Sequence, residues 1–317
     1  MSEKVKVYID GSEGTTGLRI FERFQQRSDV EILKINPELR KDSAERAKMI
    51  NSSDITFLCL PDAAAIEAVE FCTNPNVRII DASTAHRTNP DWAYGFPELS
   101  DAHRAKIKNS KRIAVPGCHA SGFISLVYPL VASGIMQKDY PIVCFSLTGY
   151  SGGGKKMIAQ YEAEERSVEL DAPREYGLTQ VHKHLKEMKA IPGLTAEPCF
   201  TPIVSDYYSG MVTTLPLFSD KLAKKVTLAE VRDFYANYYK GEKFIHVRTQ
   251  EETDELGGFL AGNLRSGWDG MEIVITGNDT RFTVNACFDN LGKGASGAAI
   301  QCMNLVLGVA EDTGLIL

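Results

Sequence analysis

The sequence lacks the features that would place it in a membrane, on nucleic acid or in an export pathway. No apolar run reaches the roughly 18 residues that a membrane-spanning helix needs. Positive charge is in deficit, with a formal net charge of −6, which argues against an extended nucleic-acid surface. The start of the chain, MSEKVKVYIDG, enters a strand pattern almost at once, so we expect no signal or transit peptide.

Paired cysteines are lacking as well. The seven cysteines are odd in number and include no C-x-x-C pair, so neither a disulfide framework nor a zinc ribbon is expected. Apolar residues make up 44% of the chain and charged residues 24%, which is typical of globular proteins. The 317 residues suffice for about two domains. We therefore expect a reduced, cytoplasmic protein with no bound metal and no membrane partner.

The first part of the chain alternates strand-like and helix-like segments. Apolar residues alternate in residues 4–10, a second strand is predicted at 29–36, and short continuous apolar runs typical of buried parallel strands lie at 54–61 and 77–83. Helical patterns separate these strands, at residues 18–27, 43–51 and 63–72. The alternation predicts an α/β fold with a doubly wound parallel sheet.

The pattern changes after residue 118. An apolar helix is followed by long strand-like segments typical of an α+β domain with a mainly antiparallel sheet: 141–150, 209–218, 243–250, 271–279 and 281–289. A final apolar helix, within residues 294–314 and ended by Gly314, is expected to return to the first domain. The predicted domains are therefore 1–118 with 288–317, and 119–287.

A glycine-rich loop joins the first strand to the first helix. DGSEGTTG spaces Gly11, Gly14 and Gly17 as G-x-x-G-x-x-G, a variant of the dinucleotide fingerprint. Missing side chains allow the tight turn, and N–H groups at the helix terminus can then meet a pyrophosphate. The second strand ends at Asn36, with no carboxylate where an NAD site usually carries one, and Arg40 and Lys41 just beyond could accept a 2′-phosphate, so NADP is favoured. Alternatively, both cations are a solvated turn.

A second glycine-rich loop imitates a P-loop without completing it. GYSGGGKK fits G-x-x-x-x-G-K, but Lys156 stands where Ser or Thr would coordinate Mg²⁺. Nucleotide hydrolysis is therefore not expected. The loop, with Ser151 and Gly152, is instead predicted to offer backbone N–H groups to an anion.

One cysteine lies where a nucleophile would. In AVPGCHASGFISLVYPLV, Cys118 follows a Pro-Gly turn and immediately precedes the apolar helix. The positive end of a helix dipole lowers a thiol pKa and favours thiolate. The alternative is a packed core thiol, since free cysteine often behaves as a small buried hydrophobe.

The thiol needs a proton-transferring partner, and YGLTQVHKHLKEM supplies two histidines. In an extended segment His182 and His184 project from the same face. If a helix starts at His184, Glu187 lies three residues on and can orient that ring. His119, next to Cys118, is expected to point elsewhere. A zinc site and a plain surface position remain alternatives for the two histidines.

Together these motifs give a resemblance. The chain resembles the N-acetyl-gamma-glutamyl-phosphate reductase family in its shorter form, within the semialdehyde dehydrogenase superfamily. The similarity spans nearly the whole length and rests on GSEGTTG, VPGCHASG, YSGGGKK, HKHLKE and DNLGKGASGAAIQCMNL. The histidine element departs from the usual H-R-H-x-P-E pattern, with Lys183 for Arg and Lys186 for Pro. Which histidine faces Cys118 is therefore open.

The resemblance implies a mechanism. The Cys118 thiolate attacks the acyl phosphate, phosphate leaves, NADPH reduces the thioester, and an aldehyde is released, with His182 or His184 moving the proton. Ser83 and Arg87, in DASTAHR, are candidates to hold the phosphate. Asn290 and Gly294 are implied at the nicotinamide end. The complete set of cofactor residues expected is Gly11, Ser12, Gly14, Thr15, Thr16, Gly17, Arg40, Lys41, Pro61, Asn290 and Gly294.

Three alternatives are kept beside this interpretation. Aspartate-semialdehyde dehydrogenase shares the architecture, but there the nucleophile follows Asn, whereas Gly117 precedes it here. A non-catalytic NADP-sensing regulator would bind cofactor with an ordinary thiol. A cofactor-free cysteine hydrolase conflicts with the glycine loop. The family usually forms homo-oligomers through the second domain's sheet, so a dimer or tetramer is expected.

Overall fold

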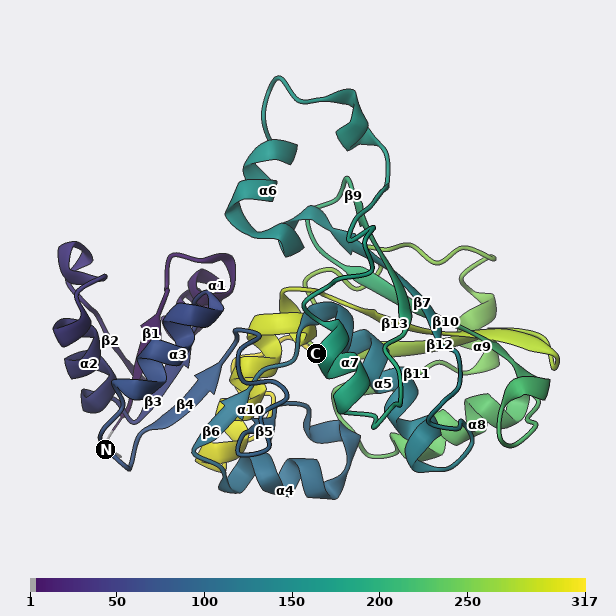
Figure 1. Ribbon diagram of the computed structural model, residues 1–317, viewed down its shortest axis with the longest axis horizontal. Coiled ribbons are helices and arrows are strands. Elements are labelled where there is room, and N and C mark those ends of the chain that lie inside the picture. Colours follow the sequence, from purple (N-terminus) through teal and green to yellow (C-terminus); the bar gives the residue numbers. More distant parts are fainter. Residues whose placement is uncertain (1–3) are drawn as a thin grey trace. The chain divides into compact units, whose positions relative to one another are not determined.

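The parallel sheet predicted for the first part of the chain is present in the computed structural model, which describes residues 4–317 (Figure 1). It has six strands in the order β2-β1-β3-β4-β6-β5, and every neighbouring pair is parallel. The strands are β1 (Val5–Asp10), β2 (Val30–Leu33), β3 (Ile55–Leu58), β4 (Arg78–Asp81), β5 (Ala93–Tyr94) and β6 (Arg112–Ala114). The doubly wound α/β prediction is confirmed.

Helices cover both faces of this sheet. They are α1 (Thr15–Phe24), α2 (Ser43–Ser52), α3 (Asp62–Glu70), α4 (Asp101–Asn109) and α10 (Gly297–Leu307). Because side chains alternate along a strand, Val7 and Ile9 join a core with α1, α4 and α10, whereas Tyr8 joins a second core with α2 and α3. Two separate apolar cores, one on each face, hold the sheet in the middle.

The chain's last helix ends earlier than predicted. It stops at Leu307, and Gly308 follows in the left-handed conformation with φ 71°. A left-handed glycine directly after the last helical residue terminates a helix, because it has no Cβ to clash. Gly314 is also left-handed, but it belongs to the turn-rich tail. The prediction that Gly314 ends the helix is therefore wrong by six residues, since 314 minus 308 is 6.

The chain divides into two compact units. The first contains residues up to Pro116 together with Ala295–Leu315, and the second contains Gly117–Gly294 together with Ile316–Leu317. Residues 117–118, 288–294 and 316–317, which we predicted with the first domain, thus fall in the second unit. The reason is local: Cys118 opens a helix that packs on the second unit's own sheet.

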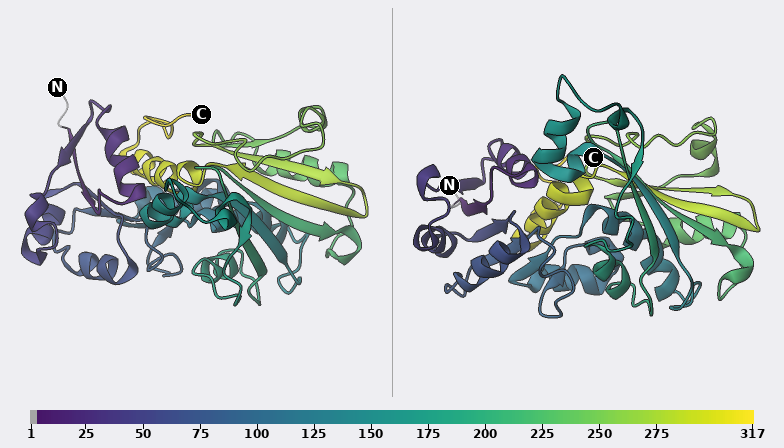
Figure 2. Two further views of the ribbon diagram at one scale, coloured as in Figure 1. Left: turned by 90° about the horizontal axis from the view of Figure 1, so that it is seen from above. Right: turned by 45° about the horizontal axis from the view of Figure 1, so that its top comes forward.

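The second sheet has seven strands in the order β11-β12-β13-β10-β7-β9-β8. Four neighbouring pairs are antiparallel, and two, β7 with β9 and β11 with β12, are parallel. Its longest strands, β10 and β13, are eight residues each, and β12 and β13 lie side by side in Figure 2. The strands are β7 (Val143–Gly149), β8 (Arg174–Glu175), β9 (Cys199–Ser205), β10 (Met211–Phe218), β11 (Ile245–Val247), β12 (Met271–Gly277) and β13 (Arg281–Phe288).

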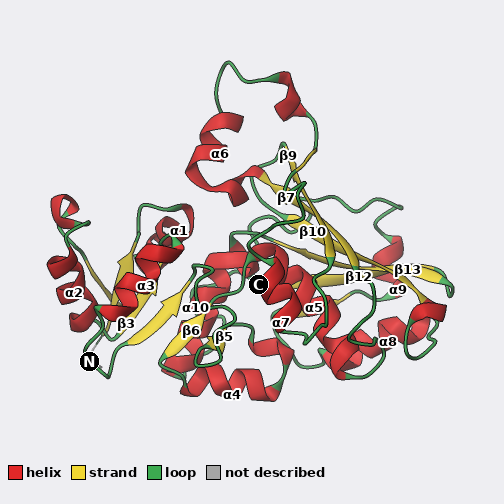
Figure 3. Ribbon diagram, in the orientation of Figure 1, coloured by secondary structure: helices red, strands yellow, loops and turns green. Residues whose placement is uncertain are grey.

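Helix α5 covers one face of this sheet. The helices of the unit are α5 (Cys118–Ala132), α6 (Gly154–Tyr161), α7 (Leu185–Ala190), α8 (Leu228–Tyr238) and α9 (Gln250–Asp254). Helix α5 packs on β10 and β13 at very close range: a Cβ at Gly122 would lie 2.3 Å from Thr213 Oγ1. The long connection from β7 to β9 contains α6, β8 and α7, with loops between them (Figure 3).

Candidate functional site

In the glycine loop of the first unit, other backbone atoms lie so close to Gly11 and Gly17 that there is no room for a side chain. Gly11 follows β1 with φ 89°, and a Cβ there would lie 2.4 Å from the carbonyl oxygen of Cys59. A Cβ at Gly17 would lie 2.4 Å from the carbonyl oxygen of Gly11. No other residue fits at either position. The predicted tight turn is therefore present, and it leads directly into α1.

The N-terminus of α1 is open for an anion. Gly14 is the N-cap residue, and glycine has no side chain to bond the first N–H groups of the helix. Thr15 and Thr16 form the first turn, so their N–H groups join this set. Pro61, the N-cap residue of α3, follows β3 at the same edge of the sheet, because neighbouring parallel strands end together. This edge fits a dinucleotide pyrophosphate.

Arg40 and Lys41 follow β2 in the same unit, after the short 3-10 helix η1 (Pro37–Leu39). Both are exposed. An ion pair joins the Arg40 guanidinium to the carboxylate of Glu13, which belongs to the glycine loop. The loop and the segment past β2 are therefore next to each other, which the sequence alone could not establish.

A buried ion pair lies at the end of β1, where the glycine loop begins. Asp10, the last residue of β1, accepts hydrogen bonds from Arg46 Nε at 3.1 Å and Nη2 at 3.0 Å. Burial raises the pKa of Asp10, and the hydrogen bonds and charge of Arg46 oppose that rise. Arg46 also donates to Glu67 at 2.8 Å. Sequence analysis missed this pair, because no motif marks a partner 36 residues away.

Ser83 and Arg87, the predicted phosphate residues, organise the turn after β4. Ser83 donates to both oxygens of Asp81, through its N–H at 2.8 Å and its hydroxyl at 2.7 Å. Arg87 is buried and donates to the carbonyl oxygens of Val115 at 2.9 Å and Ala82 at 3.1 Å. Both residues follow β4, and their contact with a phosphate stays a prediction.

Cys118 is the first residue of α5 in the second unit, and its side chain is half-buried. Gly117, the N-cap residue, leaves the helix terminus without a capping side chain, and its N–H donates to Glu187 Oε2 at 3.2 Å. Gly294 packs against the thiol residue so closely that a Cβ there would lie 3.0 Å from Cys118 Cβ. Glu187 therefore supports the start of the helix that presents the thiol.

Three histidines of the same unit gather in one cluster. The ring centroids of His182 and His184 are 4.7 Å apart, and that of His119 lies 5.7 Å and 5.8 Å from them. Helix α7 begins directly after His184, and the His184 N–H donates to His182 Nδ1 at 3.2 Å. The predicted pair is thus brought together. His119, which we expected to point elsewhere, completes the cluster.

His119 is held by a buried polar chain. Its Nδ1 is hydrogen-bonded to Ser146 Oγ at 2.8 Å, and its Nε2 to Tyr176 Oη at 2.6 Å. Burial, with the charges of His182 and Lys183, lowers the pKa of His119 to about 3, so its imidazole is neutral near pH 7. Burial, and then the electrostatic effect of the neighbouring Cys118, raise the pKa of the Tyr176 phenol. Sequence analysis missed Tyr176, since a lone tyrosine carries no signal.

The second glycine-rich loop is tied to the C-terminal motif of the unit. Ser151 is buried in the 3-10 helix η3 (Tyr150–Gly153), and its hydroxyl accepts from Asn290 Nδ2 at 3.0 Å. Asn290 Oδ1 accepts from the Gly210 N–H at 2.9 Å. A Cβ at Gly152 would lie 3.6 Å from the Asn290 amide. Asn290 therefore orders the predicted anion loop.

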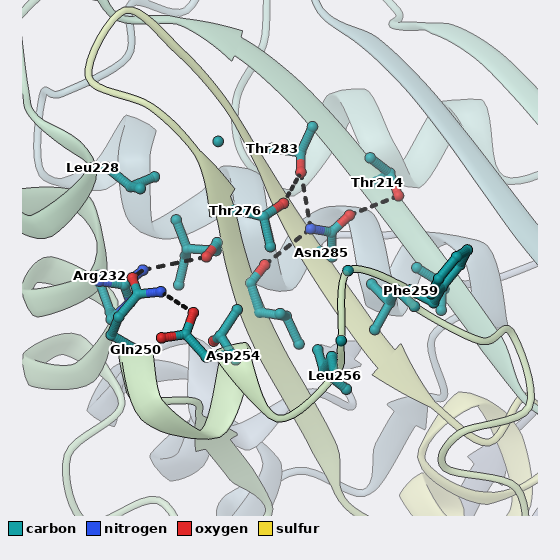
Figure 4. A pocket seen from close by; sticks show the side chains of 18 of the residues that line it. Thr214, Leu228, Arg232, Gln250, Asp254, Leu256, Phe259, Thr276, Thr283 and Asn285 are labelled. Atoms are coloured by element: carbon teal, nitrogen blue, oxygen red, sulfur yellow. Dashed lines mark hydrogen bonds between the residues drawn. The ribbon is translucent and has the colours of Figure 1, made fainter.

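The sheet face away from α5 carries a pocket of about 670 Å³ (Figure 4). Its floor is polar, with Asn285 bonded to Thr214 at 2.8 Å and Thr283 at 3.0 Å. Leu256 and the exposed Phe259 lie at its rim. None of the predicted site residues lines it. Within residues 4–317, none of the helices has the length and apolar character needed to span a membrane, and no group of three or more His, Cys, Asp or Glu side chains is arranged to hold a metal ion.

Two family models match the two parts of the chain. The semialdehyde dehydrogenase NAD binding domain matches residues 6–109, and the semialdehyde dehydrogenase dimerisation domain matches residues 118–290. The glycine loop lies in the first match, and Cys118 with its histidines in the second. The first unit therefore carries the dinucleotide-binding domain of this family.

Curated relatives match over nearly the full length. N-acetyl-gamma-glutamyl-phosphate reductase 2 of Nostoc sp. strain PCC 7120 is 42% identical, covering 98% of this chain and 99% of its own. N-acetyl-gamma-glutamyl-phosphate reductase of Sinorhizobium medicae is 44% identical, covering 96% and 99%.

Solved structures show the same fold at low identity. Aspartate semialdehyde dehydrogenase II of Vibrio cholerae has a TM-score of 0.71 at 14% identity, covering 97% of this chain and 99% of its own. The Candida albicans aspartate semialdehyde dehydrogenase with NADP has a TM-score of 0.65 at 14%, covering 97% and 99%. With the relatives above, the chain belongs to the N-acetyl-gamma-glutamyl-phosphate reductase family of the semialdehyde dehydrogenases, oxidoreductases with a nicotinamide dinucleotide cofactor.

Proposed function

We propose that this chain reduces N-acetyl-gamma-glutamyl phosphate to N-acetylglutamate semialdehyde and phosphate with NADPH, through a thioester on Cys118, as a step of arginine biosynthesis. The observation that carries the proposal is the thiol at the first residue of α5, in the same unit as a cluster of histidines. The named relatives at 42% and 44% identity support the substrate.

The first chemical step belongs to Cys118. Its thiolate sulfur attacks the acyl carbon, an S–C bond forms, and the C–O bond to phosphate breaks with its electron pair leaving on phosphate. A helix N-terminus whose cap residue is glycine favours the thiolate, because the N–H groups of the first turn point toward the negative charge. Serine would form an ester, which is a poorer hydride acceptor.

The cofactor is assigned to the edge of the first sheet. The uncapped start of α1 fits the pyrophosphate, and the cations past β2, Arg40 and Lys41, favour a 2′-phosphate and hence NADP. Ser12, Thr15, Thr16 and Pro61 complete the proposed cofactor set. When bound, the reduced nicotinamide supplies the hydride that the Cys118 thioester accepts.

Proton transfer is assigned to His182 or His184. Both ring nitrogens of His119 are already hydrogen-bonded, and its pKa of about 3 keeps it neutral, so it is unsuited to exchange protons near pH 7. His182 and His184 are therefore the remaining candidates in the cluster, and such a step is typically worth about 10²–10⁴ in rate. Ser83 and Arg87, with Ser151 and Gly152, are proposed to bind the substrate and its phosphate group.

Assembly into a homodimer or homotetramer is part of the proposal, supported by the match to the dimerisation domain. Light scattering after gel filtration measures the mass directly. A mass of 34.9 kDa at working concentration, that of one chain, would contradict assembly.

The reaction run backwards tests the chemistry. N-acetylglutamate semialdehyde, phosphate and NADP⁺ are supplied, and NADPH absorbance is followed for the wild type, Cys118→Ser and the matched control Cys199→Ser, which removes an exposed thiol of the same unit. We expect phosphate-dependent NADPH formation in the wild type and the control, and none in Cys118→Ser. Activity with aspartate semialdehyde alone would overturn the substrate, and cofactor binding without turnover on either aldehyde would favour a regulator.

A further inference from the structure

We propose that Glu13 weakens the preference of this chain for a 2′-phosphorylated dinucleotide, by competing with the phosphate for the guanidinium of Arg40. The inference rests on the proposed use of NADP and adds a residue that determines how selective the site is. Glu13 lies in the glycine loop but is not among the residues that we predicted to bind the cofactor.

The ion pair between Glu13 Oε1 and Arg40 Nη1 joins the glycine loop to the segment past β2. Glu13 lies between Gly11 and Gly14, and the Gly14 N–H donates to the Gly11 carbonyl oxygen at 3.0 Å, which fixes the turn that carries the carboxylate. The competing anion is therefore a permanent part of the loop that is assigned to the pyrophosphate.

Both partners are open to water. The Arg40 side chain is 48% exposed and that of Glu13 is 61% exposed, so the pair can break without uncovering a buried charge. Arg46, by contrast, is buried on Asp10 and also donates a hydrogen bond to Glu67. Arg40 is thus the guanidinium that an incoming phosphate can reach, and Glu13 already occupies it.

Dinucleotides with a 2′-phosphate and those with a free 2′-hydroxyl interact differently with the ion pair of Glu13 and Arg40. A phosphate monoester carries about two negative charges near neutral pH, so it must displace the carboxylate and tolerate it nearby. A free 2′-hydroxyl leaves the ion pair intact. An exposed ion pair is weak, and the competition is therefore expected to cost the phosphorylated ligand about three- to fivefold in affinity.

Fragments of the cofactor test this without turnover. Calorimetric Kd values of 2′,5′-ADP and 5′-AMP are measured for the wild type, Glu13→Gln, Arg40→Gln and the double variant. Glu70→Gln is the matched control, because it removes the same charge from an exposed position at the far end of α3. We expect Glu13→Gln to bind 2′,5′-ADP about three- to fivefold more tightly, with 5′-AMP and the control unchanged. The gain should shrink at about 0.5 M salt, where charges are screened within a few ångströms.

The outcomes separate this inference from the proposed function. If the wild type binds both fragments equally and Arg40→Gln changes neither, the preference for NADP fails and the inference with it. If the wild type prefers 2′,5′-ADP but Glu13→Gln does not alter the ratio, only the inference fails. A gain of the same size in the Arg40→Gln background would show direct repulsion by Glu13 and would overturn the competition for Arg40.

Discussion

Replacing Gly294 by alanine tests whether the packing behind Cys118 sets the reactivity of the thiol. The added Cβ would lie 3.0 Å from Cys118 Cβ, 3.2 Å from the Asp289 carbonyl oxygen and 3.3 Å from Phe288 Cε2. These separations are a few tenths of an ångström below ordinary van der Waals contact. Overpacking of this kind costs about 1–3 kcal/mol in the free energy of unfolding.

The strain should appear mainly at the thiol. Phe288 is fully buried in β13 and cannot move aside, whereas Cys118 is half-buried at the end of a helix. Because a displacement of about 1 Å at a reacting group can cost about 10²-fold in rate, a shift of a few tenths should slow the thiol about three- to tenfold. Both iodoacetamide alkylation of Cys118 and turnover should fall by this factor.

The assay is alkylation followed by peptide mass spectrometry in a Cys199→Ser background, with urea unfolding alongside. Gly95→Ala is the matched control, because its Cβ would lie 3.1 Å from the Ala114 carbonyl oxygen and 3.1 Å from Cys302 Sγ, within the core of the first unit. We expect a similar loss of stability there and an unchanged rate at Cys118. Wild-type alkylation in Gly294→Ala would refute the reasoning, because the methyl group would then be absorbed elsewhere.

The remaining predictions concern buried polar groups. Asp10→Asn strands the buried guanidinium of Arg46 and should lower the free energy of unfolding by about 3 kcal/mol, measured in urea; a loss under about 1 kcal/mol would contradict a buried pair. Tyr176→Phe removes the 2.6 Å bond to His119 and should cost about 1–3 kcal/mol in the same assay, while equal stability would mean that water replaces the phenol. The pKa of His119 is about 3 in the folded chain and near 6.5 in the unfolded chain. As the pH drops from about 6.5 toward 3, the unfolded state therefore binds the proton first. The free energy of unfolding should fall over this range by up to about 1.4 kcal/mol per pH unit. His119→Gln should remove that share of the slope in urea titrations at several pH values, and an unchanged slope would assign it to other groups.

Most of the first unit was predictable because its signals are local, whereas the short strands β5 and β6 and the helix α4 were not predicted. Apolar runs at the spacing of strands, separated by helical patterns, predict a parallel sheet without knowledge of distant contacts. The glycine loop was predictable for the same reason, since its shape depends on missing side chains within seven residues, Gly11 to Gly17. Strand β9 was missed: it contains Pro202, which argues against a strand in sequence, yet it lies between β7 and β8 in the sheet.

The candidate site was predictable only in part. The start of a helix at Cys118 follows from the Pro-Gly turn and the apolar run, and the structure has it there. The orientation of His119 depends instead on how closely α5 approaches the sheet, which Gly122 permits, and on Ser146 and Tyr176 meeting its ring. Partners that are 27 and 57 residues away leave no trace in local sequence.

During synthesis of the chain, complete folding of the first unit must wait for α10. This helix supplies core side chains to the first unit, and Arg27 Nη1 donates to Asn304 Oδ1 at 2.6 Å, across 277 residues. When Pro116 leaves the ribosome, Gly297 is still 181 residues away, since 297 minus 116 is 181. At about 5–20 residues per second, the nascent sheet waits about 10–40 s with one apolar face covered only in part, by α1 and α4. During that interval the nascent chain exposes apolar surface to which a chaperone can bind, and the interval closes when α10 packs on the sheet.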